Sequence, residues 1–221
     1  MSSEFKLAPS ILSADFSDLK GALEICALGG ADWVHIDVMD NQFVPNLTIG
    51  PPVVKSLRSK TNKFLDVHMM VIDPEKLVEP FARAGADSIT FHVEATKDPD
   101  TIIDLIKSCG CKAGVSIKPK TSIEEILPLL EKIDIVLVMS VEPGFGGQGY
   151  IQESSNRIKK IKEYLNDNCL DRVLIEVDGG VKLSNAKEIV DAGANILVAG
   201  SEVFNAKDPE KVIKKFYGLS R

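Results

Sequence analysis

Short β-branched runs alternate along the whole chain with segments whose apolar residues recur at helical spacing. The apolar residues Phe16, Leu19, Leu23 and Ala27, for example, recur every three or four positions, as they do on one face of a helix. Eight runs predict strands: Lys6–Ser10, Trp33–Met39, Phe64–Met70, Ser88–Glu94, Lys112–Lys118, Ile135–Val141, Val173–Asp178 and Ile196–Gly200. Strict alternation of strand and helix is typical of a parallel sheet, and eight such units predict an α/β fold, a single (β/α)8 TIM barrel.

One short motif recurs where a predicted helix ends and the next strand begins. It reads Gly30-Ala31-Asp32, Gly85-Ala86-Asp87 and Gly193-Ala194-Asn195, which is a weak internal repeat. A doubly wound sheet is the alternative fold, but the first strand is followed by Ile11–Asp15, without a Gly-x-Gly-x-x-Gly turn. Because no linker or break in composition interrupts the chain, we expect one catalytic domain over residues 1–221.

Composition narrows the classes of protein that the chain can represent. The 221 residues are 44% hydrophobic and 26% charged, which is typical of a globular protein, and the net charge of −6 comes with scattered basic residues. Neither nucleic acid nor a membrane is therefore an expected partner. The start of the sequence lacks the apolar segment of a signal peptide, so we expect a cytoplasmic protein with reduced, inert cysteines at positions 26, 109, 111 and 169.

Polar side chains on three predicted strands indicate a metal site. His35 and Asp37 share one face of the second strand because side chains alternate, His68 lies on the third, and Asp178 on the seventh. Since chemistry in a barrel collects at the strand ends, these four side chains can converge there. Two imidazoles and two carboxylates suit one divalent ion of Zn, Mn, Fe or Co. A buried ion-pair network is the alternative.

Glycine-rich segments follow the last three predicted strands and indicate a phosphate site. They are Gly144–Gly149, Gly179-Gly180, and Gly200-Ser201 before a short helical turn at Glu202–Phe204. In barrels, loops after strands seven and eight commonly bind phosphate through backbone N–H groups. No lysine or arginine occurs in these segments, so we expect recognition by the backbone.

A phosphorylated ligand, a divalent metal and two aspartates, without a nucleotide cofactor site, suit proton transfer beside a carbonyl. The metal would polarise the ketone and stabilise an enediolate, while Asp37 and Asp178 would remove and return the proton on opposite faces. Met39, Met70 and Met139 at strand ends could form an apolar cover that excludes water, or could simply fill the core. His92 and Glu94 also share a face, where a structural pair is the simpler interpretation.

Several motifs together closely resemble the ribulose-phosphate 3-epimerase family. They are Leu7-Ala-Pro-Ser-Ile-Leu-Ser-Ala-Asp15, Val34-His-Ile-Asp-Val-Met39, Phe43-Val-Pro-Asn46, Asp66-Val-His-Met-Met70, Val141-Glu-Pro-Gly-Phe-Gly-Gly-Gln148 and Asp178-Gly-Gly180. The resemblance covers the chain from the first strand to the eighth. It implies interconversion of D-ribulose 5-phosphate and D-xylulose 5-phosphate in the pentose phosphate pathway, and by analogy a homodimer.

The resemblance also implies roles for individual residues. His35, Asp37, His68 and Asp178 would ligate the metal, with Asp37 and Asp178 also the acid/base pair. Ser10 and His68 would contact the sugar. The phosphate end would be held by Gly144, Phe145, Gly146, Gly147, Gly179, Gly180, Gly200 and Ser201. One departure is Asn41, where the family usually has glycine; asparagine tolerates a left-handed backbone, so we expect the loop to persist.

Other functions remain to be weighed against this one. A six-carbon ketose phosphate epimerase is the nearest alternative, whereas orotidine-type decarboxylases carry Asp-x-Lys-x-x-Asp where this chain has Asp66-Val-His68-Met-Met-Val71. A Schiff-base aldolase would need a lysine at a strand end, for which Lys118 is the best candidate. A catalytically silent phosphosugar sensor would keep the glycine loops but could lose an aspartate, and both are present.

Overall fold

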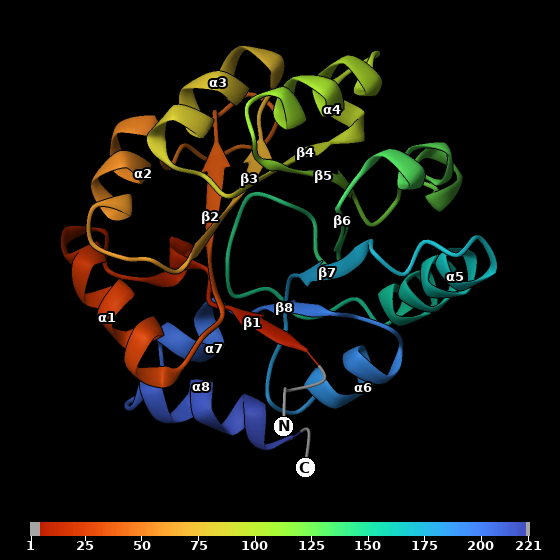
Figure 1. The fold of residues 1–221 in the computed structure, drawn as a ribbon. Coiled ribbons are helices and arrows are strands. Elements are labelled where there is room, and N and C mark those ends of the chain that lie inside the picture. The colour runs from red at the N-terminus through yellow and green to blue at the C-terminus, as the bar shows by residue number, and fades with distance from the viewer. Residues whose placement is uncertain (1–4, 220–221) are drawn as a thin grey trace.

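A computed structural model describes residues 5–219, in which eight parallel strands form a nearly closed barrel surrounded by helices (Figure 1). The hydrogen-bonded order is β1-β8-β7-β6-β5-β4-β3-β2, so successive strands from β2 to β8 pair with one another, and β8 pairs with β1. β1 and β2 do not form a ladder, and an isolated bridge between Ser10 and His35 joins the chain there. The predicted TIM barrel is confirmed. The strands are β1 (Lys6–Ala8), β2 (Trp33–Met39), β3 (Phe64–Met70), β4 (Ser88–His92), β5 (Lys112–Ile117), β6 (Ile135–Met139), β7 (Leu174–Asp178) and β8 (Ile196–Val198).

Most predicted strands continue further than the observed ones. β2 and β3 have the predicted bounds, but β1 ends before Pro9, which has no N–H to donate to a ladder, and β4 ends at His92, before a 3-10 helix at Val93–Ala95. The residues beyond the strand ends leave the sheet for the loops at the C-terminal end of the barrel. Pro9 still helps to close the barrel, because its carbonyl accepts a hydrogen bond from the His35 N–H at 3.0 Å.

Helices cover the outside of the barrel between successive strands (Figure 1). The exception follows β5, where two 3-10 helices, Ile123–Glu125 and Leu127–Lys132, replace the predicted α-helix; Pro128 interrupts helical hydrogen bonding there. The α-helices are α1 (Leu19–Gly29), α2 (Pro51–Arg58), α3 (Glu75–Ala84), α4 (Pro99–Ser108), α5 (Glu153–Asp167), α6 (Ala186–Asp191), α7 (Ser201–Phe204) and α8 (Pro209–Gly218).

The recurring Gly-Ala-Asp or Gly-Ala-Asn motif has a structural role at the strand starts. Asp32 accepts a side-chain hydrogen bond from the Leu7 N–H at 3.0 Å, and its own N–H donates to the Leu7 carbonyl. Three further residues make the same reciprocal pair with the preceding strand: Asp87 with Leu65, Asp134 with Ala113, and Asn195 with Ile175. Each of these clamps joins an odd-numbered strand to the even-numbered strand that follows it.

Side chains alternate between the two faces of the barrel wall. On β2, Val34, Ile36 and Val38 point outward into the main core, which also contains Phe81 of α3. Inside the barrel, apolar residues gather at the strand starts, where the rings of Trp33 and Phe64 stack 4.1 Å apart. Polar side chains follow two residues further along the same inner face, so the inside of the barrel becomes polar toward the C-terminal ends.

The structure also bears on the expectations for Asn41, for a membrane helix and for the cysteines. Asn41 has a φ of 58°, so the left-handed backbone expected at this position is confirmed. No helix within residues 5–219 is long and apolar enough to cross a membrane. The four cysteines are all free. The start of the chain at residues 1–4, on which the signal-peptide expectation rests, lies outside the described residues.

Candidate active site

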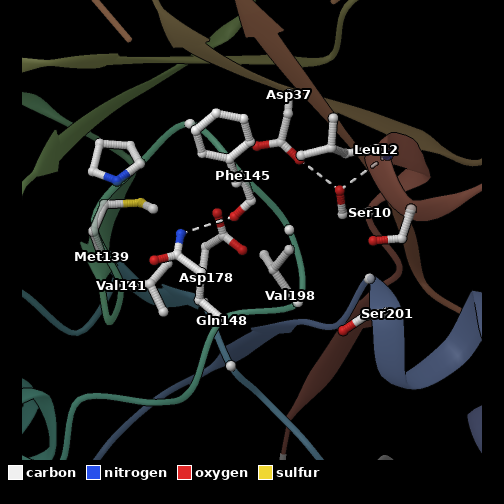
Figure 2. Close-up of a pocket in the computed structure, with 18 of the residues that line it drawn as sticks. Ser10, Leu12, Asp37, Met139, Val141, Phe145, Gln148, Asp178, Val198 and Ser201 are labelled. Carbon is white, nitrogen blue, oxygen red and sulfur yellow. Dashed lines mark hydrogen bonds between the residues drawn. The ribbon is translucent and has the colours of Figure 1, made fainter. Parts of the chain in front are cut away.

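A pocket opens where the strands end, at the C-terminal face of the barrel (Figure 2). Met39, Met70, Met139, Asp178 and Val198 line it, and each is the last residue of its strand. Loops that follow the strands complete the wall. The pocket therefore forms at the end of the barrel where the alternation of side chains places the polar groups.

Four side chains from three strands meet at the floor of this pocket. His35 and Asp37 from β2, His68 from β3 and Asp178 from β7 offer ligand atoms that all lie within 4.8 Å of one another. His68 Nδ1 lies 3.2 Å from Asp37 Oδ1 and 3.8 Å from Asp178 Oδ2. The imidazole rings are fully buried, whereas the Asp178 side chain reaches the pocket. The predicted convergence of these four residues is therefore present in the structure.

The His35 ring is oriented so that one nitrogen faces this cluster without a hydrogen bond. Its Nδ1 lies 2.6 Å from Asp66 Oδ2, and its buried Nε2 has no hydrogen-bond partner among the described residues. Nε2 lies 3.5 Å from Asp37 Oδ1, too far for a well-formed hydrogen bond. With the proton on Nδ1, the lone pair of Nε2 points at the carboxylates. A buried, unpaired imidazole nitrogen beside two carboxylates and a second imidazole fits a divalent cation.

The two aspartates of the cluster differ in their affinity for protons. Burial raises the pKa of Asp178, and repulsion from Asp37 raises it further, to about 6. Burial also acts to raise the pKa of Asp37, but attraction to His35 and the hydrogen bond from His68 outweigh it and lower that pKa. Burial disfavours the charged His35 ring, yet attraction to Asp37 and Asp66 raises its pKa well above 6.5.

A second polar group lies on the inner barrel face beneath the cluster. Asp66 Oδ1 accepts a hydrogen bond from Ser88 Oγ at 2.5 Å, and Glu176 Oε1 lies 3.4 Å from His35 Nδ1. Burial and the neighbouring Asp66 carboxylate raise the pKa of Glu176 well above 4.5 and so favour its neutral form. A second buried cluster of His35, Asp66 and Glu176 thus adjoins the first, and the two clusters share His35.

The predicted pair of His92 and Glu94 is also in contact, although not along one strand. Glu94 lies in the 3-10 helix after β4, and its Oε2 is 3.1 Å from His92 Nδ1. Burial lowers the pKa of His92 to about 4, so the ring is neutral at pH 7. The geometry of this pair differs from the shared strand face that the alternation predicted.

The three glycine-rich segments form one wall of the pocket. Gly180 has a φ of 63°, and a Cβ there would collide with the backbone nitrogen of Tyr150, so only glycine fits. The loop after β6 is held by Gln148, whose Nε2 donates to the Phe145 carbonyl at 2.9 Å (Figure 2), and by Asn46, whose Nδ2 donates to the Gly144 carbonyl at 3.0 Å. The described residues that line the pocket include no lysine or arginine.

The structure brings the predicted site residues together around this pocket. Ser10 donates a 2.5 Å hydrogen bond from Oγ to Asp37 Oδ2 (Figure 2). His68 differs from the other predicted substrate contacts, because its side chain is fully buried and does not line the pocket. Those lining the pocket are Ser10, Asp37, Met39, Met70, Met139, Gly144, Phe145, Gly146, Gly147, Asp178, Gly179, Gly180, Gly200 and Ser201.

Some residues that line the pocket were not among the predicted site residues. They are Leu12, Ser13, Val141, Pro143, Gln148, Val181 and Val198. Most of them belong to the motifs quoted above, where apolar and small residues beside a glycine or a serine give no chemical signal of their own. For those that lie within a motif, membership of the motif was the only sign that they belong to the site.

Comparisons with known proteins show the family of the chain and its fold. A family model described as "Ribulose-phosphate 3 epimerase family" matches residues 6–204. The chain is 46% identical to ribulose-phosphate 3-epimerases of Buchnera aphidicola subsp. Schizaphis graminum and of Bacillus subtilis, over 96% of this chain and 93% and 98% of theirs. Among solved structures, KGPDC from Streptococcus mutans has a similar fold, with a TM-score of 0.72, 19% identity, and coverage of 97% of this chain and 96% of that chain.

Proposed function

The chain belongs to the ribulose-phosphate 3-epimerase family and is an epimerase, and we propose that it inverts C3 of a ketose phosphate by proton transfer between two aspartates. The substrate pair is D-ribulose 5-phosphate and D-xylulose 5-phosphate. The observation that carries this proposal is the placement of Asp37 and Asp178, which come from β2 and β7 and offer carboxylate oxygens within 4.8 Å of each other at one pocket.

Inversion of a carbon centre requires a proton to leave one face and another to arrive on the opposite face. β2 and β7 are separated by β1 and β8 in the barrel wall, so the two aspartates approach the pocket from different directions. The lowered pKa of Asp37 keeps it ionised and so able to accept a proton, and the pKa of about 6 for Asp178 suits an acid near neutral pH. The roles exchange when the reaction runs in reverse.

His35, Asp37, His68 and Asp178 would hold one divalent cation of Zn, Mn, Fe or Co. When bound, such a cation acts as a Lewis acid on the substrate's carbonyl and makes the neighbouring C–H bond more acidic. Asp66 contributes by accepting the Nδ1 proton of His35, so that Nε2 is left as the ligand atom. Ser10 donates to Asp37 Oδ2 and so fixes the carboxylate that faces the substrate.

The glycine-rich segments would bind the phosphate end of the substrate through backbone N–H groups. Their backbones line the pocket, and Gly200 precedes α7, whose first N–H groups have no partners within the helix. Met39, Met70 and Met139 would cover the reacting carbons with apolar surface. We further propose that residues 1–221 form one catalytic domain that works as a homodimer in the cytoplasmic pentose phosphate pathway.

The test is direct conversion of substrate by the purified protein. D-ribulose 5-phosphate is incubated with protein loaded with Zn²⁺ or Mn²⁺, and formation of D-xylulose 5-phosphate is followed by NMR, with a six-carbon ketose 6-phosphate in parallel. We expect conversion of the pentose phosphate with a higher kcat/KM than the hexose phosphate. Absence of conversion by loaded protein, or a clear preference for the hexose phosphate, would overturn the proposed substrate.

A further inference from the structure

Three polar side chains form a continuous chain from the floor of the pocket toward the outside of the barrel. His68 Nε2 lies 3.0 Å from Nε2 of His92, the last residue of β4, and His92 Nδ1 lies 3.1 Å from Glu94 Oε2. Both rings are fully buried, and the Glu94 side chain is 20% exposed. His68 presents its other nitrogen, Nδ1, to Asp37 and Asp178.

The partners of this chain determine which nitrogen of each ring carries a proton. A carboxylate only accepts hydrogen bonds, so His92 Nδ1 must carry the proton that it donates to Glu94. A neutral imidazole has one N–H, which leaves His92 Nε2 as an acceptor. The facing Nε2 of His68 must then be the donor. Nδ1 of His68, which lies 3.2 Å from Asp37 Oδ1, is therefore the nitrogen that can give up its proton to expose a lone pair when a cation displaces this contact.

We propose that Glu94 and His92 are positioning residues that set the tautomer of His68, so that its Nδ1 lone pair is available to a divalent cation. The proposal rests on the metal site of the proposed function. His35 achieves the same result with one carboxylate, Asp66, and with the opposite nitrogen as ligand. His68 is reached through a second imidazole because Thr90, rather than an acid, stands opposite it on β4.

Neighbouring groups hold the relay in this orientation. Glu94 Oε1 accepts hydrogen bonds from the backbone N–H of Lys118, at 2.7 Å, and from the Thr121 hydroxyl. The ring of Phe43 packs on His92 with centroids 5.0 Å apart, and Lys118 Nζ lies 3.8 Å from the centroid of the Phe43 ring. A fixed backbone donor at Oε1 leaves Oε2 as the oxygen that faces His92.

This arrangement makes Glu94→Gln a tautomer-reversing substitution of nearly unchanged shape. The Lys118 N–H would keep the amide oxygen of the new side chain on its own side, so that the amide NH2 group would face His92 Nδ1. His92 Nδ1 would then have to accept a hydrogen bond from the amide, so His92 Nε2 would carry the proton and donate to His68 Nε2. His68 Nε2 would thereby become an acceptor, and the proton of the His68 ring would lie on Nδ1. The matched control is Glu125→Gln, which makes the same charge change at an exposed glutamate.

The first readout is the tautomer of His68 in the metal-free protein, from long-range 1H–15N correlation NMR; the chain has only three histidines, which simplifies assignment. We expect Nε2 of His68 to carry a proton in the wild type and in Glu125→Gln, and to be unprotonated in Glu94→Gln. The second readout is the affinity for Zn²⁺ alone, by chelator competition, which should fall roughly 10–100-fold in Glu94→Gln only.

Separate outcomes test the relay and the proposed function. An unprotonated Nε2 of His68 in the wild type would overturn the relay without any variant, as would unchanged Zn²⁺ affinity in Glu94→Gln. A wild type that binds no Zn²⁺ would overturn the metal site of the proposed function and remove the purpose of the relay. If Glu94→Gln does not fold, His92→Phe, which removes the acceptor, should give the same loss of Zn²⁺ affinity.

Discussion

Replacing Asp178 by Asn should stabilise the metal-free protein at pH 8 while removing most of its activity. The Asp178 carboxyl is held beside Asp37 in a largely buried site, and both burial and repulsion favour its neutral form. A carboxyl whose pKa is raised by folding destabilises the folded protein wherever it is ionised. Asn keeps the shape of the side chain and has no charge to lose.

The size of this effect follows from the pKa of Asp178, which folding raises from 3.8 to about 6. Below pH 3.8 the carboxyl is protonated in both the folded and unfolded chains and costs nothing. Above pH 6 it is ionised in both, and two pKa units correspond to about 3 kcal/mol of lost stability. The stability gained by Asp178→Asn should therefore be about 2–3 kcal/mol greater at pH 8 than at pH 4.

The measurement is urea unfolding of wild type and variant in the presence of a chelator, at pH 4 and pH 8. Asp171→Asn, at an exposed aspartate, is the control for the loss of a charge. Adding Zn²⁺ should make the wild type more stable than Asp178→Asn at pH 8, because the ion would neutralise both carboxylates only in the wild type. Activity should fall roughly 10²–10⁴-fold. A stability difference that is the same at both pH values, or full activity in a metal-loaded variant, would refute this reasoning.

Four further measurements test other parts of the site. His68→Ala should lose the stoichiometric metal of about one ion per chain, and elemental analysis that matches the wild type would disprove the ligand set. Zn²⁺ affinity of the wild type should rise as pH increases, because the raised pKa of His35 means that a proton must leave before the ion binds; an affinity independent of pH would contradict this. Gly200→Val, whose Cβ would lie 2.7 Å from Ser13 Oγ, should raise the KM for the phosphorylated ketose roughly tenfold or more, through loss of a backbone hydrogen bond to a charged group; an unchanged KM would place the phosphate elsewhere. In deuterated water the product should gain deuterium at C3, whereas label at C1 would indicate aldose–ketose isomerisation.

The order of elements was predictable from the sequence because side-chain periodicity is a local property. β2 and β3 have the predicted bounds because their residues are apolar or inward-facing along their whole length. Where a strand leaves the sheet depends on whether a neighbour still pairs with it, and the runs of β4 and β6 continue past that point. The absent helix after β5 has a local signal in Pro128, which the periodic spacing around it obscured.

The part of the candidate site that depends on the alternation of side chains along single strands was predictable from the sequence. Alternation places His35 and Asp37 on one face, and barrel geometry then brings in His68 and Asp178. Contacts between strands need the register, which the sequence of one strand does not contain. The hydrogen bond between His35 and Asp66 forms because these two residues are register partners on β2 and β3. The contact of His68 with His92 depends on how β4 is staggered relative to β3.

The four clamps at the strand starts divide the barrel into quarters, because each clamp closes one pair of successive strands. A break in the chain between β4 and β5 would sever none of them, so each half would keep two clamps within its own fragment. The candidate metal-binding cluster would instead be split, with Asp178 alone in the second half. Co-expressed halves should therefore regain Zn²⁺ binding only by reassembling. The end of the barrel where the strands start therefore has a structural repeat of two β/α units, because one clamp occurs in each such pair. The opposite end, with the pocket and the His/Asp cluster, has no such repeat.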